Sequence, residues 1–330
     1  MRRSLKRQSL IYAAAIAALA LSSSVVPSAS HAADWAQTAA GAAQPREGLL
    51  RTFVDAKTGK VLVQVPPAGA DGVALRVIYQ ASLATGLGST SLGLDRAATG
   101  RAQLLAFRRA GKKVIIQAEN PEFRANGAGA LEAGAVRSSF AVSNLWSGDA
   151  IAEGPDGAAL VDITSFLTQD TLDVAGRIRM RKQGVYRPAA NLTYVDAPRS
   201  GVFPTNLEFE AVQTFTADDP GLEVRAVAPD ARSITLTVHH SFVKLPEPGF
   251  EPRKHDPRTG TSVQVPVVDF AAPLDAPIAY RLARRFRLEK TDPSAARSRV
   301  KKPIVFYVDR AAPEPIRSAL VEGANWWGQA

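Results

Sequence analysis

Short segments with a strand pattern, divided by turn residues, recur along most of this chain and restrict the folds that it can adopt. Residues 49–66 alternate apolar and polar side chains on both sides of Lys57-Thr58-Gly59-Lys60, which predicts a β-hairpin. Similar segments follow at residues 73–83, 104–120, 135–146, 158–163, 206–216, 222–228, 233–245, 262–270, 279–290 and 301–309. The series predicts an α+β protein that is mainly β, with a multi-stranded antiparallel body and few helices.

Two other kinds of segment interrupt the series. Residues 166–184 place apolar side chains at helical spacing, which predicts one helix that either Ser165 or Asp170 can cap. Residues 126–134 are rich in glycine and alanine and are expected to form a loop, where the body has a possible internal boundary. The proline-rich stretch 246–257 predicts an extended surface loop, because proline donates no backbone hydrogen bond to a sheet.

The N-terminus has the pattern of a secretory signal peptide over residues 1–32. Arg2, Arg3, Lys6 and Arg7 precede the apolar run 10–21, and Ser30-His31-Ala32 supplies small residues for cleavage. The apolar run is shorter than the roughly 20 residues of a membrane-spanning helix, so no transmembrane anchor is expected. The product would be exported and periplasmic, envelope-associated or extracellular. Residues 33–48 are expected to be a flexible leader.

Charge and cysteine content exclude several classes of function. The signal peptide contains four of the 40 basic side chains and none of the 31 acidic ones, so its removal lowers the formal charge from +9 to +5. This mild bias is weak evidence for a nucleic-acid partner, and none is expected. The absence of cysteine excludes a disulfide framework and thiol catalysis.

The histidines give no metal site. A zincin protease needs H-E-x-x-H, which places two imidazoles on one helical face, and the sequence does not contain it. His239 and His240 are adjacent in a strand pattern and should point to opposite faces of a sheet. His255 lies in a turn-forming stretch. We expect structural roles for all three histidines. The alternative is a more specific role, in which they contact another domain or a substrate.

Other candidate chemistry is equally sparse. Glu208 and Glu210 share one face of a strand, an arrangement also found in a glycosidase pair, but solvated carboxylates are the more common reason for such a pattern. The sequence contains no G-x-S-x-G motif and no phosphate-binding lysine after its glycine-rich stretch 86–93. Strand alternation puts Arg284 on the apolar side of residues 279–290, where a buried guanidinium would need a carboxylate partner. No catalytic and no metal-binding residue is therefore assigned.

The C-terminal segment has an apolar helical face. Ile316, Leu320, Gly323 and Trp327 recur at helical spacing, and Trp326 lies beside them. Pro315 suits the first turn of that helix. Such a bulky face is expected to pack against a partner surface, and the sequence ends without supplying one.

Several extended motifs, in order, resemble those of one family of bacterial proteins. They are ASLATGLGSTSLGLDR (81–96), FRRAGKKVIIQAENPEFRA (107–125), FPTNLEFE (203–210), TLTVHHSFVKLPEPGFEPRKHDPRTG (235–260), RRFRLEKTDP (284–293) and KKPIVFYVDRAAPEPIRSALVEGANWW (301–327). The chain resembles the N-terminal regions, of unknown function, of exported zinc-dependent metalloproteases. The resemblance implies a β-rich accessory domain over residues 49–298, followed over residues 299–330 by the first strand and helix of a truncated zincin catalytic domain.

The resemblance also implies a function. The chain would be a non-catalytic scaffold that is inactive alone, with zinc held only by the missing catalytic domain and no cofactor of its own. Its partners would be that domain, missing or separate, and a peptide or protein substrate, with His239, His240, His255, Arg284, Trp326 and Trp327 as candidate contacts. The alternative is a stand-alone secreted β-rich binding module of the cell envelope. An inhibitory pro-segment is a third possibility, without a supporting motif.

Overall fold

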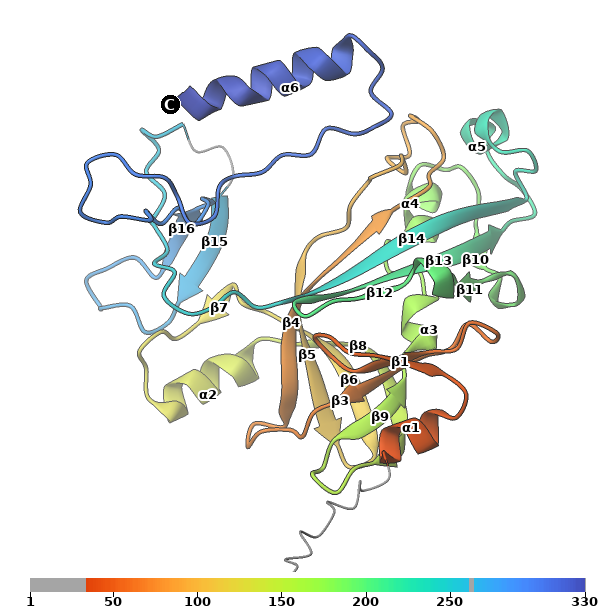
Figure 1. Ribbon diagram of the computed structural model, residues 1–330, viewed down its shortest axis with the longest axis horizontal. Helices are drawn as coiled ribbons and strands as arrows, with labels where there is room; N and C mark the ends of the chain where they lie inside the picture. The colour runs from red at the N-terminus through yellow and green to blue at the C-terminus, as the bar shows by residue number, and fades with distance from the viewer. Residues whose placement is uncertain (1–33, 261–263, 330) are drawn as a thin grey trace, which may run out of the picture.

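The computed structural model describes residues 34–260 and 264–329. The predicted signal peptide lies outside this range and stays a prediction. The largest unit of the described chain is one large sheet, beside which lie a small sheet and a C-terminal helix (Figure 1). No helix in the described ranges combines the length and the hydropathy that crossing a membrane requires.

The large sheet contains thirteen strands of the described chain, all paired antiparallel, and curls into a nearly closed barrel (Figure 1). Its main path is β1 (Gln44–Arg46), β2 (Thr52–Val54), β3 (Val61–Val65), β9 (Ala159–Asp162), β8 (Ser143–Glu153), β6 (Lys113–Glu119), β5 (Gln103–Ala110), β4 (Val73–Leu83), β14 (Ser233–Lys244), β13 (Asn206–Thr216) and β10 (Arg187–Pro188). Two short strands, β11 (Tyr194–Val195) and β12 (Gly201–Val202), also pair with β13. The expected antiparallel, mainly β class is confirmed.

Alternation along the strands builds the core inside this curled sheet. On β13 and β14 nearly every second side chain is buried, which is the period of a strand with one face turned inward. Phe242 lies at the centre of the core, with the rings of Tyr79, Phe107, Phe166 and Phe209 around it at centroid distances of 5.0–6.4 Å. Tilted and edge-on ring contacts of this kind add to the burial of apolar area.

The helix predicted over residues 166–184 is divided in two. Helix α3 (Thr164–Leu167) buries Phe166 and Leu167 in the core, and α4 (Val174–Met180) follows after a bend. The Asp170 carboxylate accepts hydrogen bonds from the backbone N–H groups of Val174 (2.7 Å) and Ala175 (3.0 Å). Asp170 thus satisfies free donors at the start of α4, as its predicted capping role requires.

The segment expected to be a flexible leader is ordered instead. Helix α1 (Trp35–Ala40) buries Ala36 against Phe53 and Leu62 of the sheet, and β1 pairs with β2. Asp34 caps the helix by accepting from the Gln37 N–H. Small alanine side chains allow close packing on the sheet, so low hydrophobicity did not prevent folding of this segment.

Two further sequence predictions are wrong. Residues 126–134 were expected as a loop, but helix α2 (Ala130–Ser139) begins within them and replaces the start of the strand predicted over 135–146. Glu132, the third helical residue, accepts from the Gly129 N–H, which is the half of a capping box that a glycine N-cap allows. Residues 222–228 form helix α5 (Leu222–Val227) rather than a strand. In both segments a short apolar pattern was compatible with either structure.

The small sheet consists of β7 (Phe123–Arg124), β15 (Gln264–Asp269) and β16 (Ala279–Ala283). Residues 246–257 form an extended loop beside it, as predicted, and only Lys254 makes an isolated bridge, to Leu282. Beyond β16 the chain runs without regular structure to helix α6 (Ile316–Trp326), which stands apart from both sheets (Figure 1). Three short 3-10 turns complete the described elements: Ala190–Leu192, Ala197–Arg199 and Trp327–Gln329.

The expected strand at residues 301–309 is absent from the structure. Its apolar side chains are exposed, and Tyr307 retains 94% of its accessible surface. A strand needs a neighbouring strand to pair its backbone groups, and no neighbour among the described residues provides one. The helix predicted after it is present as α6.

Candidate functional site

The adjacent histidines of β14 point to opposite sides of the sheet, as predicted from strand alternation. His240 is completely buried inside the barrel, whereas His239 lies on the outer face and is partly exposed. The two imidazoles therefore experience different environments and are considered separately.

His240 belongs to the aromatic core. Its Nδ1 lies 2.8 Å from the Tyr79 hydroxyl, and the rings of Tyr79 and Phe166 flank it. Burial without a countercharge lowers the pKa of His240 to about 3, so the ring is neutral at physiological pH. Burial also raises the pKa of the Tyr79 hydroxyl. Because both groups are enclosed, they contribute to packing and not to chemistry on a substrate.

His239 is held between two carboxylates on the outer face. Its Nε2 lies 2.9 Å from Glu208 Oε2, and its Nδ1 lies 3.8 Å from Glu210 Oε1. Both glutamates come from β13, whose register places Glu210 opposite His239 and Glu208 two residues along, opposite Ser241. Cross-strand neighbours on one sheet face are close enough to interact in this way.

Further hydrogen bonds fix the Glu208 carboxylate. It accepts from Asn206 Nδ2 (2.6 Å) and from Ser241 Oγ (2.9 Å). Partial burial raises the pKa of Glu208, but the hydrogen bonds from His239, Asn206 and Ser241 outweigh it and lower the pKa overall. In turn the hydrogen bond to Glu208 raises the pKa of His239.

This arrangement is an ion pair rather than a catalytic centre. A general base needs a free nitrogen directed at a substrate, but both nitrogens of His239 face glutamates. Within residues 34–260 and 264–329, no three His, Cys, Asp or Glu side chains are grouped to hold a metal ion. The residues present therefore do not fit zinc.

The remaining predicted contact residues lie elsewhere. His255 is beside the small sheet, where its Nε2 is 2.9 Å from Gln264 Nε2 and its backbone N–H donates to the Arg281 carbonyl. Arg284 follows the end of β16 and is exposed, so the prediction that it faces an apolar side is wrong. Trp326 and Trp327 are exposed at the end of α6. The structure does not bring these residues together with the β14 histidines.

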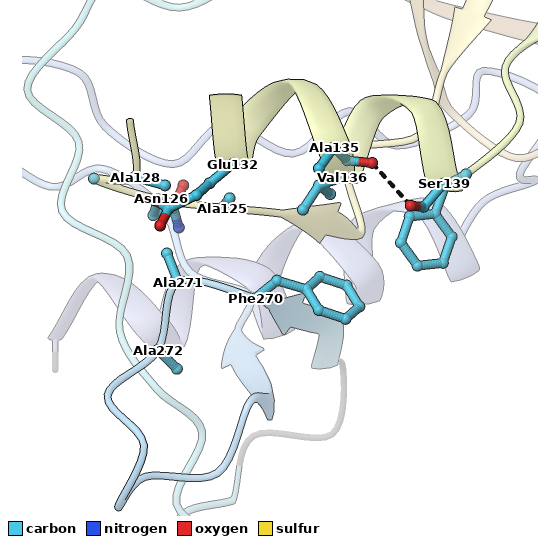
Figure 2. Close-up of a pocket in the computed structure, with 12 residues that line it drawn as sticks. Ala125, Asn126, Ala128, Glu132, Ala135, Val136, Ser139, Phe270, Ala271 and Ala272 are labelled. Carbon is cyan, nitrogen blue, oxygen red and sulfur yellow. Dashed lines mark hydrogen bonds between the residues drawn. The ribbon is translucent and has the colours of Figure 1, made fainter. Parts of the chain in front are cut away.

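A cavity that the sequence did not predict lies beside α2. It has a volume of about 600 Å³, and Figure 2 shows α2 along one side and the segment after β15 along the other. Its aromatic wall is Phe140, which stacks on Phe123 at 3.9 Å and contacts Phe270 at 5.5 Å. The full lining is Ala125, Asn126, Gly127, Ala128, Glu132, Ala135, Val136, Ser139, Phe140, Phe270, Ala271 and Ala272.

Several polar groups of this cavity are already engaged. The Glu132 carboxylate caps α2, the Ser139 hydroxyl donates to the Ala135 carbonyl at 2.8 Å (dashed in Figure 2), and the Asn126 N–H donates to Asp269 Oδ1 at 3.0 Å. Alanine methyl groups and two phenylalanine rings make the rest of the surface apolar. Such a cavity suits an apolar side chain of a peptide better than a reacting polar group.

Comparison with known proteins gives one family. The model of the family described as "Domain of unknown function (DUF5117)" matches residues 97–291, which is more than half of the chain. No curated protein and no solved structure matches the chain.

Proposed function

The chain belongs to the DUF5117 family of domains of unknown function, and from its surfaces we propose that it is a non-catalytic accessory region of an exported zinc-dependent metalloprotease. Its role would be to support the catalytic domain and to contribute to substrate docking. The ordered motifs described above support this assignment by resemblance. Under this proposal zinc and the hydrolytic water would belong to the partner domain, since the described residues include no group of His, Cys, Asp or Glu side chains that could hold a metal ion.

One observation carries the proposal: the C-terminal tail, residues 303–329, displays apolar side chains that the rest of the described chain does not cover. Ile316, Leu320 and Trp326 are exposed on α6, and Trp327 retains 80% of its accessible surface. Contiguous apolar surface of this kind marks a contact with another protein surface. A catalytic domain would bury the apolar face of α6 and pair residues 303–309 as a strand.

One ion pair links the tail to the body of the protein. Arg96 Nη2 lies 2.6 Å from Asp309 Oδ2, which joins the loop after β4 to the part of the tail before α6. Both residues belong to motifs that carry the resemblance. An exposed ion pair contributes little stability, but it orients the segment that presents the apolar side chains.

The test starts from the gene. The proposal expects an H-E-x-x-H-x-x-G-x-x-H sequence to be encoded after codon 330 or beside this gene in the source genome. Adding that domain, produced separately, to this chain should protect residues 304–327 from hydrogen exchange. The variant Trp326→Ser/Trp327→Ser should bind it at least tenfold more weakly, because large interface aromatics dominate binding energy.

Leu222→Ser supplies the matched control, because Leu222 is a large apolar residue that is exposed on α5, away from the tail. It should leave the association unchanged. Absence of the motif from the genome, or a tail that exchanges equally fast with and without the added domain, would refute the proposal.

The cavity beside α2 favours a second candidate, a stand-alone secreted binding module. Its volume of about 600 Å³ lies in the range of ligand pockets, and its lining is mainly apolar. This candidate predicts that the chain alone is monodisperse and that its tail resists limited proteolysis as well as the sheet does. Rapid cleavage within the tail would favour the accessory role instead.

A further inference from the structure

Outside residues 1–32, the excess positive charge of this chain is confined to one region. Residues 244–302 contain 13 basic and 7 acidic side chains, whereas residues 33–243 contain 21 of each, and residues 303–330 contain two basic and three acidic ones. The net charge is therefore +6 in the first region, zero in the second and −1 in the third. We call residues 244–302, which include β15 and β16, the basic lobe.

The structure keeps many of these charges uncompensated. The guanidinium of Arg285 donates to the backbone carbonyl of Glu251, Arg281 Nη1 donates to Gln264 Oε1 at 2.9 Å, and Lys290 Nζ donates to the Ala295 carbonyl at 2.6 Å. Neutral oxygen acceptors hold the side chains in place without cancelling their charge. The lobe therefore presents a fixed positive surface.

Three more cations are freely available. Arg253, Arg284 and Arg299 are exposed and make no side-chain hydrogen bond or ion pair with the described residues. Arg253 and Arg284 flank β16, and Arg299 follows in the next loop. No acidic side chain of the described residues neutralises these three guanidinium groups.

Large apolar side chains are exposed among these cations. Phe286 and Leu288 retain 59% and 50% of their accessible surface, and Leu274, at the turn between β15 and β16, is fully exposed. Phe250 lies under the guanidinium of Arg285, with the Arg285 Cζ 4.5 Å from the ring centroid. In Figure 1 the β15–β16 connection and the loop that follows β16 project on the same side of the molecule, away from the barrel.

We propose that the basic lobe binds a lipid surface that carries anionic headgroups. Lysine and arginine gain energy in the negative potential of such a surface, while phenylalanine and leucine side chains enter the boundary between headgroups and acyl chains. Nucleic acid fits less well, because bases stack on aromatic rings and gain nothing from exposed leucines. The inference rests on charge and exposure within the lobe and does not depend on a protease partner.

Vesicle co-sedimentation of the full chain tests this proposal. Vesicles of phosphatidylcholine with roughly one-third phosphatidylglycerol should bind the protein, and vesicles of phosphatidylcholine alone should bind it far less. The variant Arg253→Gln/Arg284→Gln/Arg299→Gln should lower the partition coefficient by roughly 100-fold, since each cation near an anionic surface contributes about a factor of five. Phe286→Ser/Leu288→Ser should lower it by roughly tenfold.

The matched control removes three exposed cations outside the lobe. Arg179, Arg181 and Arg187, in and after α4, are exposed and form no ion pair with the described residues. Their replacement by Gln should leave the partition coefficient within about twofold of wild type, with an unchanged melting temperature in every variant. The N-terminal residues are kept identical throughout, so that any contribution of residues 1–32 cancels in the ratios.

Three results would overturn the proposal. Equal binding to neutral and anionic vesicles would show that charge is not recognised, and equal loss in the lobe and control variants would show that the lobe is not the binding surface. Tighter binding to polyglutamate or to single-stranded DNA than to anionic vesicles, at matched charge and salt, would assign the lobe to another class of partner. Weakening of vesicle binding by added salt supports the proposal.

Discussion

The two adjacent histidines should change stability with pH in opposite directions, and His240 gives the larger effect. Its pKa is about 3 in the folded protein and about 6.5 in an unfolded chain. Below pH 6.5 the unfolded state therefore binds a proton that the folded state does not. The stabilisation is complete above pH 6.5 and is lost progressively as the pH falls toward 3. At about pH 5 the loss amounts to about 2 kcal/mol.

Urea unfolding of wild type and His240→Gln at about pH 5 and pH 7.5 measures this term. His240→Gln should be less stable than wild type at pH 7.5, and its disadvantage should shrink by about 2 kcal/mol at pH 5. Tyr79→Phe is the control, because it removes the hydroxyl partner of His240 but keeps the imidazole and its pH dependence. If His240→Gln loses as much stability on acidification as wild type does, the buried neutral imidazole is not responsible.

His239 should behave in the opposite way. Its folded-state pKa is raised by Glu208, so its contribution is present below pH 6.5 and is lost as the pH rises through the folded-state value. The pKa of Glu208 is lowered, so Glu208 is negatively charged and His239 positively charged between about pH 4.5 and 6.5. Since His239 is 33% exposed, we expect His239→Gln to cost about 1 kcal/mol more at pH 5.5 than at pH 8.5.

Three further substitutions test the fold. Phe242→Ala should lower the free energy of unfolding in urea by about 4 kcal/mol, because it leaves a cavity in the aromatic core, and a loss below 1 kcal/mol would contradict the packing described. Asp34→Ala should lower the free energy of unfolding by about 1 kcal/mol and speed hydrogen exchange in α1, because it removes the helix cap. It also removes the ion-pair partner of Arg51, whose hydrogen bond lowers the pKa of Asp34 to about 2. Trp326→Ser/Trp327→Ser should change the free energy of unfolding by less than about 0.5 kcal/mol, because neither ring is packed, and a larger loss would show that α6 is docked on the body.

The sequence predicted features whose cause is local. Strand alternation was enough to place His239 and His240 on opposite faces, since the period of two is a property of the backbone itself. It was not enough to show that His239 pairs with Glu208, because that contact depends on the register between β13 and β14. Register follows from the whole sheet and has no signature in either strand alone.

Short segments were the least predictable. Residues 222–227 alternate like a strand but form α5, and Pro220-Gly221 immediately before them is compatible with a helix start as well as with a turn. For α2, the spacing of Gly129 and Glu132 was the available signal of a capped helix, but a capping box usually begins with serine or threonine. Counting charge segment by segment would have found the basic lobe, which the total charge conceals.

The family match and the folded unit have different boundaries. The matched region starts at residue 97, but β4 ends at Leu83 and lies between β5 and β14 in the middle of the large sheet. Without β4, both of those strands would expose an unpaired edge, and the core would lose Tyr79, which contacts Phe242 and His240. The strands β1–β3 complete the same sheet on the side of β9. The residues of the main core therefore extend from Leu50 to Phe242, while α1 packs in a second, smaller cluster with Phe53 and Leu62. The matched segment is part of a larger structural unit whose N-terminal strands it cannot replace.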